Sequence, residues 1–83
     1  MDADELLGYV LSSTRRKQVL RELRQKPKRP MELCRKLTID TGNMARILIQ
    51  LEKKGLIRCI TPDKKSWRVY KITDTGEKIL KGL

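Results

Sequence analysis

The fold can be predicted from the segment DTGNMARILIQLEKKG, which occupies residues 40–55. Its large apolar residues Met44, Leu48 and Leu51 recur at intervals of four and three, which is the spacing of one face of a helix. The aspartate or the threonine at the beginning of the stretch can cap a helix, and the glycine at its end is typical of a helix stop. The sequence therefore predicts an amphipathic helix over residues 40–54.

A shorter helix is predicted immediately before it, over residues 30–37. Leu33, Cys34 and Leu37 have the spacing of a short amphipathic helix, and a proline such as Pro30 is favoured in the first turn. Only two residues separate this helix from the longer one. The two segments therefore form a helix-turn-helix unit, which the proline-containing loop 26–30 separates from the preceding chain.

Two more helices are predicted nearer the N-terminus. The first begins near Asp2 or Asp4, and the second begins after a Ser-Ser-Thr break and runs to about Lys26. Both need a partner surface, because each has an apolar stripe. The stripes consist of Leu6, Leu7, Val10 and Leu11 in the first helix and of Val19, Leu20 and Leu23 in the second.

The pattern changes after Gly55. Two runs rich in β-branched and aromatic residues, 56–61 and 67–73, flank a polar turn and predict an antiparallel hairpin. Thr73 or Asp74 can cap a last helix, whose apolar residues are Ile79, Leu80 and Leu83. The expected fold is α+β and mostly α. It is a single winged helix-turn-helix domain over residues 1–83, with a three-helix core, a two-stranded hairpin wing and additional N- and C-terminal helices.

The charge of the chain indicates an anionic partner. Its 83 residues carry a formal net charge of +10, which is more than solubility requires and is typical of nucleic-acid binding. Residues 1–13 contain three acidic and no basic residues, so this end is expected to face away from a polyanion.

Other function classes lack their usual sequence features. The chain has no histidine, glycine-rich phosphate loop or paired-carboxylate motif, so we expect neither an enzyme nor a bound cofactor. Cys34 and Cys59 are too far apart for a zinc knuckle and are interpreted as reduced core cysteines, with no metal site. With no membrane-spanning segment or signal peptide, a soluble protein in the cytoplasm, associated with the nucleoid, is expected.

The order and spacing of these segments resemble the winged-helix transcription regulators of the MarR/ArsR type, particularly their small stand-alone archaeal forms. The resemblance covers about residues 12–83 and implies DNA binding, usually as a dimer. A Glu-Leu-Cys run at residues 32–34 also resembles the start of the metal-sensing motif of some ArsR-type repressors. Basic residues replace the second cysteine of that motif, so metal sensing is not supported. The segments that carry the main resemblance are ELCRKL (32–37), MAR (44–46) with Leu48, LE (51–52), GLI (55–57) and YKITDTG (70–76).

The predicted partner is double-stranded DNA, with helix 40–54 in the major groove and the wing 61–68 on the backbone or in the minor groove. The outer face of the helix supplies the side chains that read bases, and flanking cations hold phosphates. The predicted base-reading residues are Thr41, Gly42, Asn43, Arg46 and Gln50. The predicted backbone and wing contacts are Lys28, Arg29, Lys36 (or Arg35), Arg58, Lys64, Lys65 and Arg68.

Four other residues carry specific expectations. Ile47 and Ile49 make the reading helix apolar on more than one face, so one of them is expected to pack against the wing or a partner. Trp67 is expected to pack against the hairpin rather than to stack on a base, and Tyr70 to lie in the core.

Alternatives remain open at this point. The apolar stripes of the N- and C-terminal helices predict a homodimer through these helices, or else the helices fold back onto the same chain. Fold alone does not exclude a protein-interaction module of a transcription or repair assembly, with Ile47 and Ile49 as anchors. An architectural DNA binder or an RNA binder without sequence preference is the third possibility.

Overall fold

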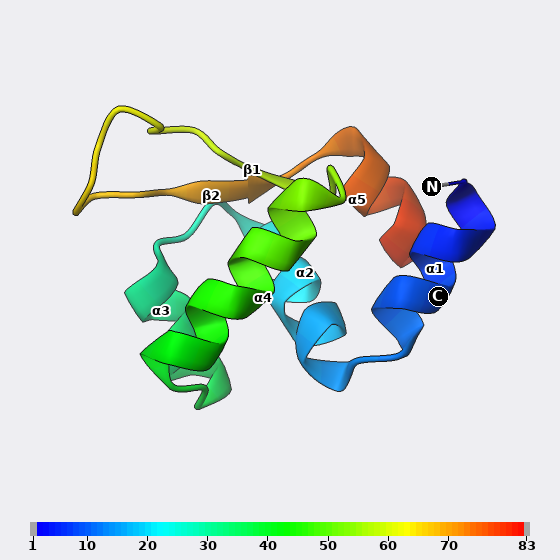
Figure 1. Ribbon diagram of the computed structural model, residues 1–83, viewed down its shortest axis with the longest axis horizontal. Coiled ribbons are helices and arrows are strands. Elements are labelled where there is room, and N and C mark those ends of the chain that lie inside the picture. Colours follow the sequence, from blue (N-terminus) through cyan, green and yellow to red (C-terminus); the bar gives the residue numbers. More distant parts are fainter. Residues whose placement is uncertain (1, 83) are drawn as a thin grey trace.

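The computed structural model describes residues 2–82 and contains five helices and one small antiparallel sheet in that range. In chain order the elements are α1 (Ala3–Leu11), α2 (Thr14–Gln25), α3 (Pro30–Leu37), α4 (Thr41–Lys53), β1 (Ile57–Cys59), β2 (Tyr70–Ile72) and α5 (Asp74–Lys81). Figure 1 shows α2, α3 and α4 as the central group, with the hairpin extending beyond α3. The predicted winged helix-turn-helix fold is confirmed.

The helices begin and end where local chemistry directs them. Asp2, Ser13 and Asp40 cap α1, α2 and α4, each through a side-chain oxygen that accepts a backbone N–H of the first turn. Pro30 opens α3, as predicted. Gly55 follows α4 with a φ of 74°, a left-handed conformation that glycine adopts without the steric cost other residues incur.

The core lies where α2, α3 and α4 meet the hairpin. Residues from all four contribute to it, including Leu20, Leu33, Met44 and Ile57, each at most 1% exposed. Tyr70 is also buried, which confirms its predicted place in the core. The apolar faces of these elements thus pack into one continuous hydrophobic core around α2.

The strands of the wing are shorter than the predicted runs 56–61 and 67–73. Ile57, Arg58 and Cys59 pair with Ile72, Lys71 and Tyr70, and one further hydrogen bond joins Ile60 N to Val69 O at 2.8 Å. Beyond that point the Thr61 hydroxyl accepts from Val69 N and donates to Trp67 O, both at 2.9 Å. A side chain therefore replaces the backbone ladder there, and the regular strands end.

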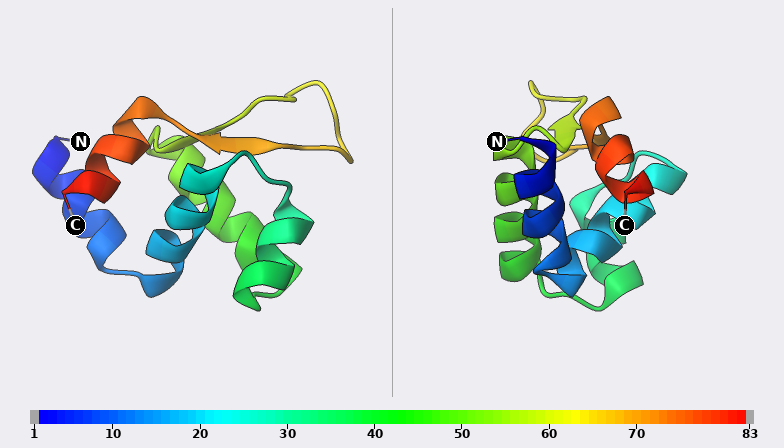
Figure 2. Two further views of the ribbon diagram at one scale, coloured as in Figure 1. Left: turned by 180° about the vertical axis from the view of Figure 1, so that it is seen from behind. Right: turned by 90° about the vertical axis from the view of Figure 1, so that its right-hand side faces the viewer.

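The two terminal helices lie together at the end of the molecule opposite the wing tip, as the views in Figures 1 and 2 agree. α1 packs against α2 and α5, and Leu6, Val10, Ile79 and Leu80 are buried in the common core. The alternative that these helices fold back onto the same chain therefore accounts for much of their apolar surface. Leu11 remains 50% exposed, and the predicted contribution of Leu83 lies outside the described residues.

Both cysteines are free thiols in this fold. Cys34 is buried in α3, and burial together with the nearby Asp40 carboxylate raises the pKa of its thiol. Cys59 is half-buried. Within residues 2–82 no group of three or more potential ligand side chains is arranged around a metal position, and no helix is long and apolar enough to cross a membrane.

Candidate nucleic-acid interface

The outward face of α4 is the centre of the candidate interface. Met44, Ile47, Leu48 and Leu51 are buried, and because successive residues of a helix are rotated by about 100°, the opposite side is fixed by them. That opposite side carries an exposed basic residue in the middle of the helix and a second one near its end. The exposed residues on it are Gly42, Arg46, Ile49 and Lys53.

Asn43 and Gln50 lie at the edge of this face rather than at its centre. Both are half-buried, and both already hold hydrogen bonds within the chain. The amide of Asn43 donates to the capping Asp40 carboxylate, whereas Gln50 Oε1 accepts from Arg16 Nη2 at 3.4 Å. Of the five predicted base-reading residues, the structure therefore leaves Thr41, Gly42 and Arg46 exposed and engages the two amides internally.

The cap of α4 has an electrostatic consequence. Asp40 Oδ2 accepts the backbone N–H of Asn43 at 3.0 Å. This bond, followed by the bond from the Asn43 side chain, holds the pKa of Asp40 below its usual value. A full negative charge therefore sits at the beginning of α4, where it stabilises the helix end but repels a phosphate placed directly there.

The wing presents the cations that were predicted for it. Lys64, Lys65 and Arg68 are all exposed, the first two in the loop and the third on its return. Arg68 is anchored, because its Nη1 donates to the Tyr70 hydroxyl at 3.2 Å, and this bond raises the pKa of the guanidinium. The loop thus combines two exposed ammonium groups with one guanidinium that a hydrogen bond holds.

Trp67 corrects a prediction. It was expected to pack against the hairpin, but its side chain is 65% exposed. The Arg29 guanidinium lies over its ring, 5.0 Å from the centroid, in a cation–π contact. The prediction is wrong because the Thr61 hydroxyl closes the loop through the backbone and leaves the indole outside.

Lys28 corrects a second prediction. Lys28 is only 6% exposed. Its ammonium donates to the Glu22 carbonyl at 2.6 Å and lies 3.6 Å from Glu22 Oε1. Its backbone also pairs with Tyr70 of β2 in an isolated antiparallel bridge. Lys28 is therefore a structural residue that ties α2 to the sheet, and the prediction that it contacts a DNA backbone is wrong.

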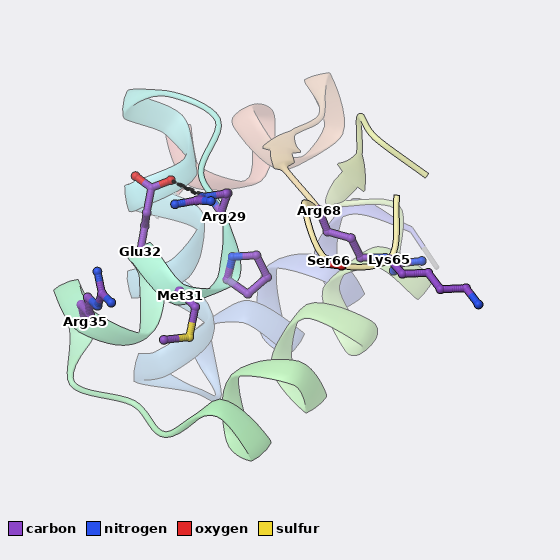
Figure 3. Close-up of a pocket in the computed structure, with 8 residues that line it drawn as sticks. Arg29, Met31, Glu32, Arg35, Lys65, Ser66 and Arg68 are labelled. Carbon is purple, nitrogen blue, oxygen red and sulfur yellow. Dashed lines mark hydrogen bonds and ion pairs between the residues drawn. The ribbon is translucent and has the colours of Figure 1, made fainter. Parts of the chain in front are cut away.

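A cleft lies between α3 and the wing. Figure 3 shows Arg29, Met31 and Arg35 on the α3 side and Lys65 and Arg68 on the wing side. One carboxylate, Glu32, shares the cleft and lies 3.8 Å from Arg29 Nε. The cations outnumber it, so the cleft is a basic surface that leads from α3 to the wing tip.

Two predicted backbone contacts lie apart from this cleft. Arg58 is exposed at the base of the hairpin, where it lines a separate depression with Lys71 and Asp74 of α5. Lys36 is exposed near the end of α3, but the preceding Arg35 is the one that lines the cleft. Sequence reasoning also left Lys53 out of the site, although its distance of seven residues from Arg46 places both on one helix face.

A second groove connects the wing with α4. Met31 and Pro30 of α3, Ala45 and Ile49 of α4, and Arg68 of the wing line it, beside the cleft described above. The cleft and the groove share Met31 and Arg68, so one edge of α4, α3 and the wing border adjoining hollows. The helix-turn-helix formed by α3 and α4, with the hairpin beside it, defines the class of the protein, which is that of the winged helix-turn-helix proteins.

The chain belongs to the HxlR-like helix-turn-helix family, whose sequence profile matches residues 10–83. No curated protein sequence matches it. Among solved structures, it is similar to the oxidised form of MarR from E. coli, with a TM-score of 0.76 and 27% identity. The match covers 96% of this chain and 61% of that MarR chain.

Two further structures extend the comparison. A cysteine-to-serine mutant of E. coli MarR complexed with operator DNA has a TM-score of 0.77 and 29% identity, and the match covers 96% of this chain and 61% of that one. The adhesin competence repressor AdcR from Streptococcus pyogenes shares the fold, with a TM-score of 0.73, 16% identity, and coverage of 95% and 65%. The resemblance to MarR-type regulators is thereby confirmed, and the chain spans about 61% of the length of MarR.

Proposed function

We propose that this chain is a sequence-specific regulator that binds double-stranded DNA, with α4 in the major groove and the wing on the backbone or in the minor groove. The observation that carries the proposal is the groove between α4 and the wing, which Ala45 and Ile49 line together with Arg68, next to the exposed side of α4 that holds Arg46. A major groove about 12 Å wide admits one helix of the diameter of α4. The MarR structure complexed with operator DNA, to which this chain is similar, supports DNA as the partner.

The contacts divide by role. Arg46 is the proposed base reader, because a guanidinium can donate two hydrogen bonds to a guanine. Gly42 lies one turn before it on the same face, next to the exposed Thr41 at the beginning of α4. Lys64, Lys65 and Arg68 are the proposed phosphate contacts of the wing. Arg29, Arg35 and Lys36 extend that basic surface along α3.

Asn43 and Gln50 remain candidate readers of adenine on this proposal, but each must first release its internal partner. Arg58 extends the basic surface at the base of the hairpin. The function proposed is binding without catalysis and without a cofactor, and a regulator of this kind acts on the nucleoid in the cytoplasm.

We further propose that the protein binds DNA as a homodimer through the terminal helices. Leu11, at the end of α1, is the exposed part of a stripe that is otherwise used in the core, and a second copy can cover it. A two-fold dimer would place its reading helices about 34 Å apart, one turn of the duplex. Sedimentation of wild type and Leu11→Glu tests this, and a Leu11→Glu variant that sediments like the wild type would contradict it.

The test of DNA recognition is selection from a library of random duplexes, followed by affinity measurements on the selected and a random duplex at several salt concentrations. Arg46→Ala should weaken binding to the selected duplex by about 1–3 kcal/mol and barely change binding to the random one. Lys64→Ala is the matched control, since loss of a phosphate contact weakens both alike. Equal losses on both duplexes for Arg46→Ala would contradict the assigned role.

The same measurements separate the other readings. A protein-interaction module would retain no duplex from the library. An architectural or RNA-binding protein would bind the selected and random duplexes, or single-stranded RNA, with equal affinity.

A further inference from the structure

One apolar side chain occupies the middle of the basic face of α4. Ile49 is 54% exposed, whereas Ile47, two residues earlier, is 7% exposed and belongs to the core. Ile49 stands one turn after Arg46 and one turn before Lys53, both exposed on the same side. The helix therefore presents an aliphatic group to the outside exactly where its two cations flank it.

Ile49 is not isolated on that side. Thr41, Ala45 and Ile49 follow one another at intervals of four, so they form one edge of α4, and all three are exposed. The same three residues line the groove toward the wing, together with Met31 and Arg68. This edge, which we call the methyl edge, presents methyl groups over about 12 Å of helix.

The chemistry of the major groove gives such an edge a particular counterpart. Each base pair shows a pattern of donors and acceptors there, and only thymine adds a methyl group, at C5. An isoleucine side chain neither donates nor accepts a hydrogen bond. In a groove it can therefore distinguish bases only by apolar contact, which favours thymine over cytosine.

We propose that Ile49 contacts the C5 methyl group of a thymine next to the base read by Arg46 and so selects an A·T pair there. This inference rests on the proposed function, since it requires α4 in the major groove. Three helical residues span about 4.5 Å along the axis, against a rise of about 3.4 Å per base pair. The thymine therefore lies within about two base pairs of the base that Arg46 reads.

The test uses a modified probe, namely the duplex enriched by selection in which each thymine is replaced in turn by deoxyuridine. Deoxyuridine keeps every hydrogen-bonding group of thymine and lacks only the methyl group. At one position per half-site the substitution should lower the affinity of the wild type about fourfold, the value of one buried methylene. Ile49→Ala should bind the thymine and deoxyuridine duplexes equally at that position.

Two matched variants complete the design. Leu11→Ala shortens an equally exposed leucine, 50% exposed, at the far end of the molecule, and should retain the fourfold difference whatever its overall affinity. Ile49→Val keeps both branches at Cβ and should retain most of the difference. Circular dichroism confirms that each variant is folded, as expected for exposed positions.

The outcomes are distinct. If the wild type binds the selected duplex but tolerates deoxyuridine at every position, or if Ile49→Ala shows the same penalty as the wild type, the thymine contact is overturned and DNA binding stands. If no duplex is retained in the selection, DNA binding and the thymine contact are both overturned.

Discussion

Lys28 and Arg46 carry the same charge but belong to opposite parts of the molecule. The ammonium of Lys28 is buried against the Glu22 carbonyl and carboxylate, whereas Arg46 is exposed on α4. A buried charge requires a partner, because transfer from water to the interior is costly. The fold therefore uses one cation to hold α2 against the sheet and leaves the other available to a ligand.

This difference predicts an unequal effect of removing either kind of charge. Lys28→Met leaves the Glu22 carboxylate buried without its cation, and we expect the free energy of unfolding to fall by about 3 kcal/mol. Urea unfolding followed by circular dichroism measures it. Lys36→Met, which removes an exposed cation from α3, is the control and should change stability little. Similar losses of unfolding free energy in the two variants would show that the Lys28–Glu22 ion pair does not stabilise the fold.

Among the elements, α4 needs a stable first turn, because Thr41 and Gly42, two of the proposed DNA contacts, lie there. Asp40 provides that stability through its bonds to Asn43. The cap also determines how this element responds to acid.

Because the pKa of Asp40 is lowered in the folded protein, its contribution to stability is fully present above the pKa of the unfolded chain, about 4. It is lost as the pH falls through the lower folded pKa. Asp40→Asn keeps a capping side chain without the titration. The thermal midpoint of the wild type should therefore fall relative to that of Asp40→Asn as the pH drops below about 4. A difference that stays constant from neutral pH to pH 2 would contradict this account.

Gly8 of α1 and Gly76 of α5 differ in how closely other parts of the chain pack against them. A Cβ added to Gly76 would collide with the Leu56 carbonyl oxygen and approach Ile72 Cγ1 to 2.6 Å, whereas one added to Gly8 meets nothing within 4 Å. The first turn of α5 thus lies directly on the hairpin backbone.

Gly76→Ala and Gly8→Ala should consequently change stability in opposite directions. The first is expected to lower the free energy of unfolding by about 1–3 kcal/mol through overpacking. The second should raise it by about 0.5–1 kcal/mol, since alanine loses less conformational freedom in a helix. Thermal or urea unfolding of both variants is the measurement, and a stabilised Gly76→Ala would refute the close contact of α5 with the hairpin.

At the scale of the whole molecule, charge is distributed along the long axis. Residues 2–5 contribute three carboxylates to the end at which α1 and α5 lie, and the wing carries its cations at the opposite end (Figure 1). A polyanion is therefore attracted more strongly to the wing than to the end at which α1 lies. On the proposed function, this separation orients the protein on DNA before any base is read.

The distribution predicts which lysines contribute to the salt dependence of binding. Lys65→Ala should reduce the slope of log affinity against log salt concentration by about 1, the value of one phosphate contact. Lys81→Ala, at the opposite end in α5, should leave the slope unchanged. Fluorescence anisotropy on a random duplex measures both, and equal slopes for the two variants would contradict the proposed orientation.

Local patterns were sufficient to predict the elements. The intervals of Met44, Leu48 and Leu51, the proline that opens α3 and the glycine after α4 depend on neighbouring residues, so their outcome could be predicted without the fold. The ends of the strands could not, because the Thr61 hydroxyl reaches Val69 and Trp67 across the loop. Contacts between residues distant in sequence have no local signal.

The fold class, the amphipathic α4 and the net charge of +10 that indicates an anionic partner all follow from the order and type of the residues. Tertiary structure alone decided that Ile47 is core and Ile49 is exposed, that Lys28 is buried and that Trp67 is outside. The physical reason is that periodicity specifies which residues share a face, whereas burial depends on what the rest of the chain places against that face. The helix between Asp40 and Gly55 could be predicted from its own residues, whereas its proposed role as an interface depends on the wing and α3 beside it.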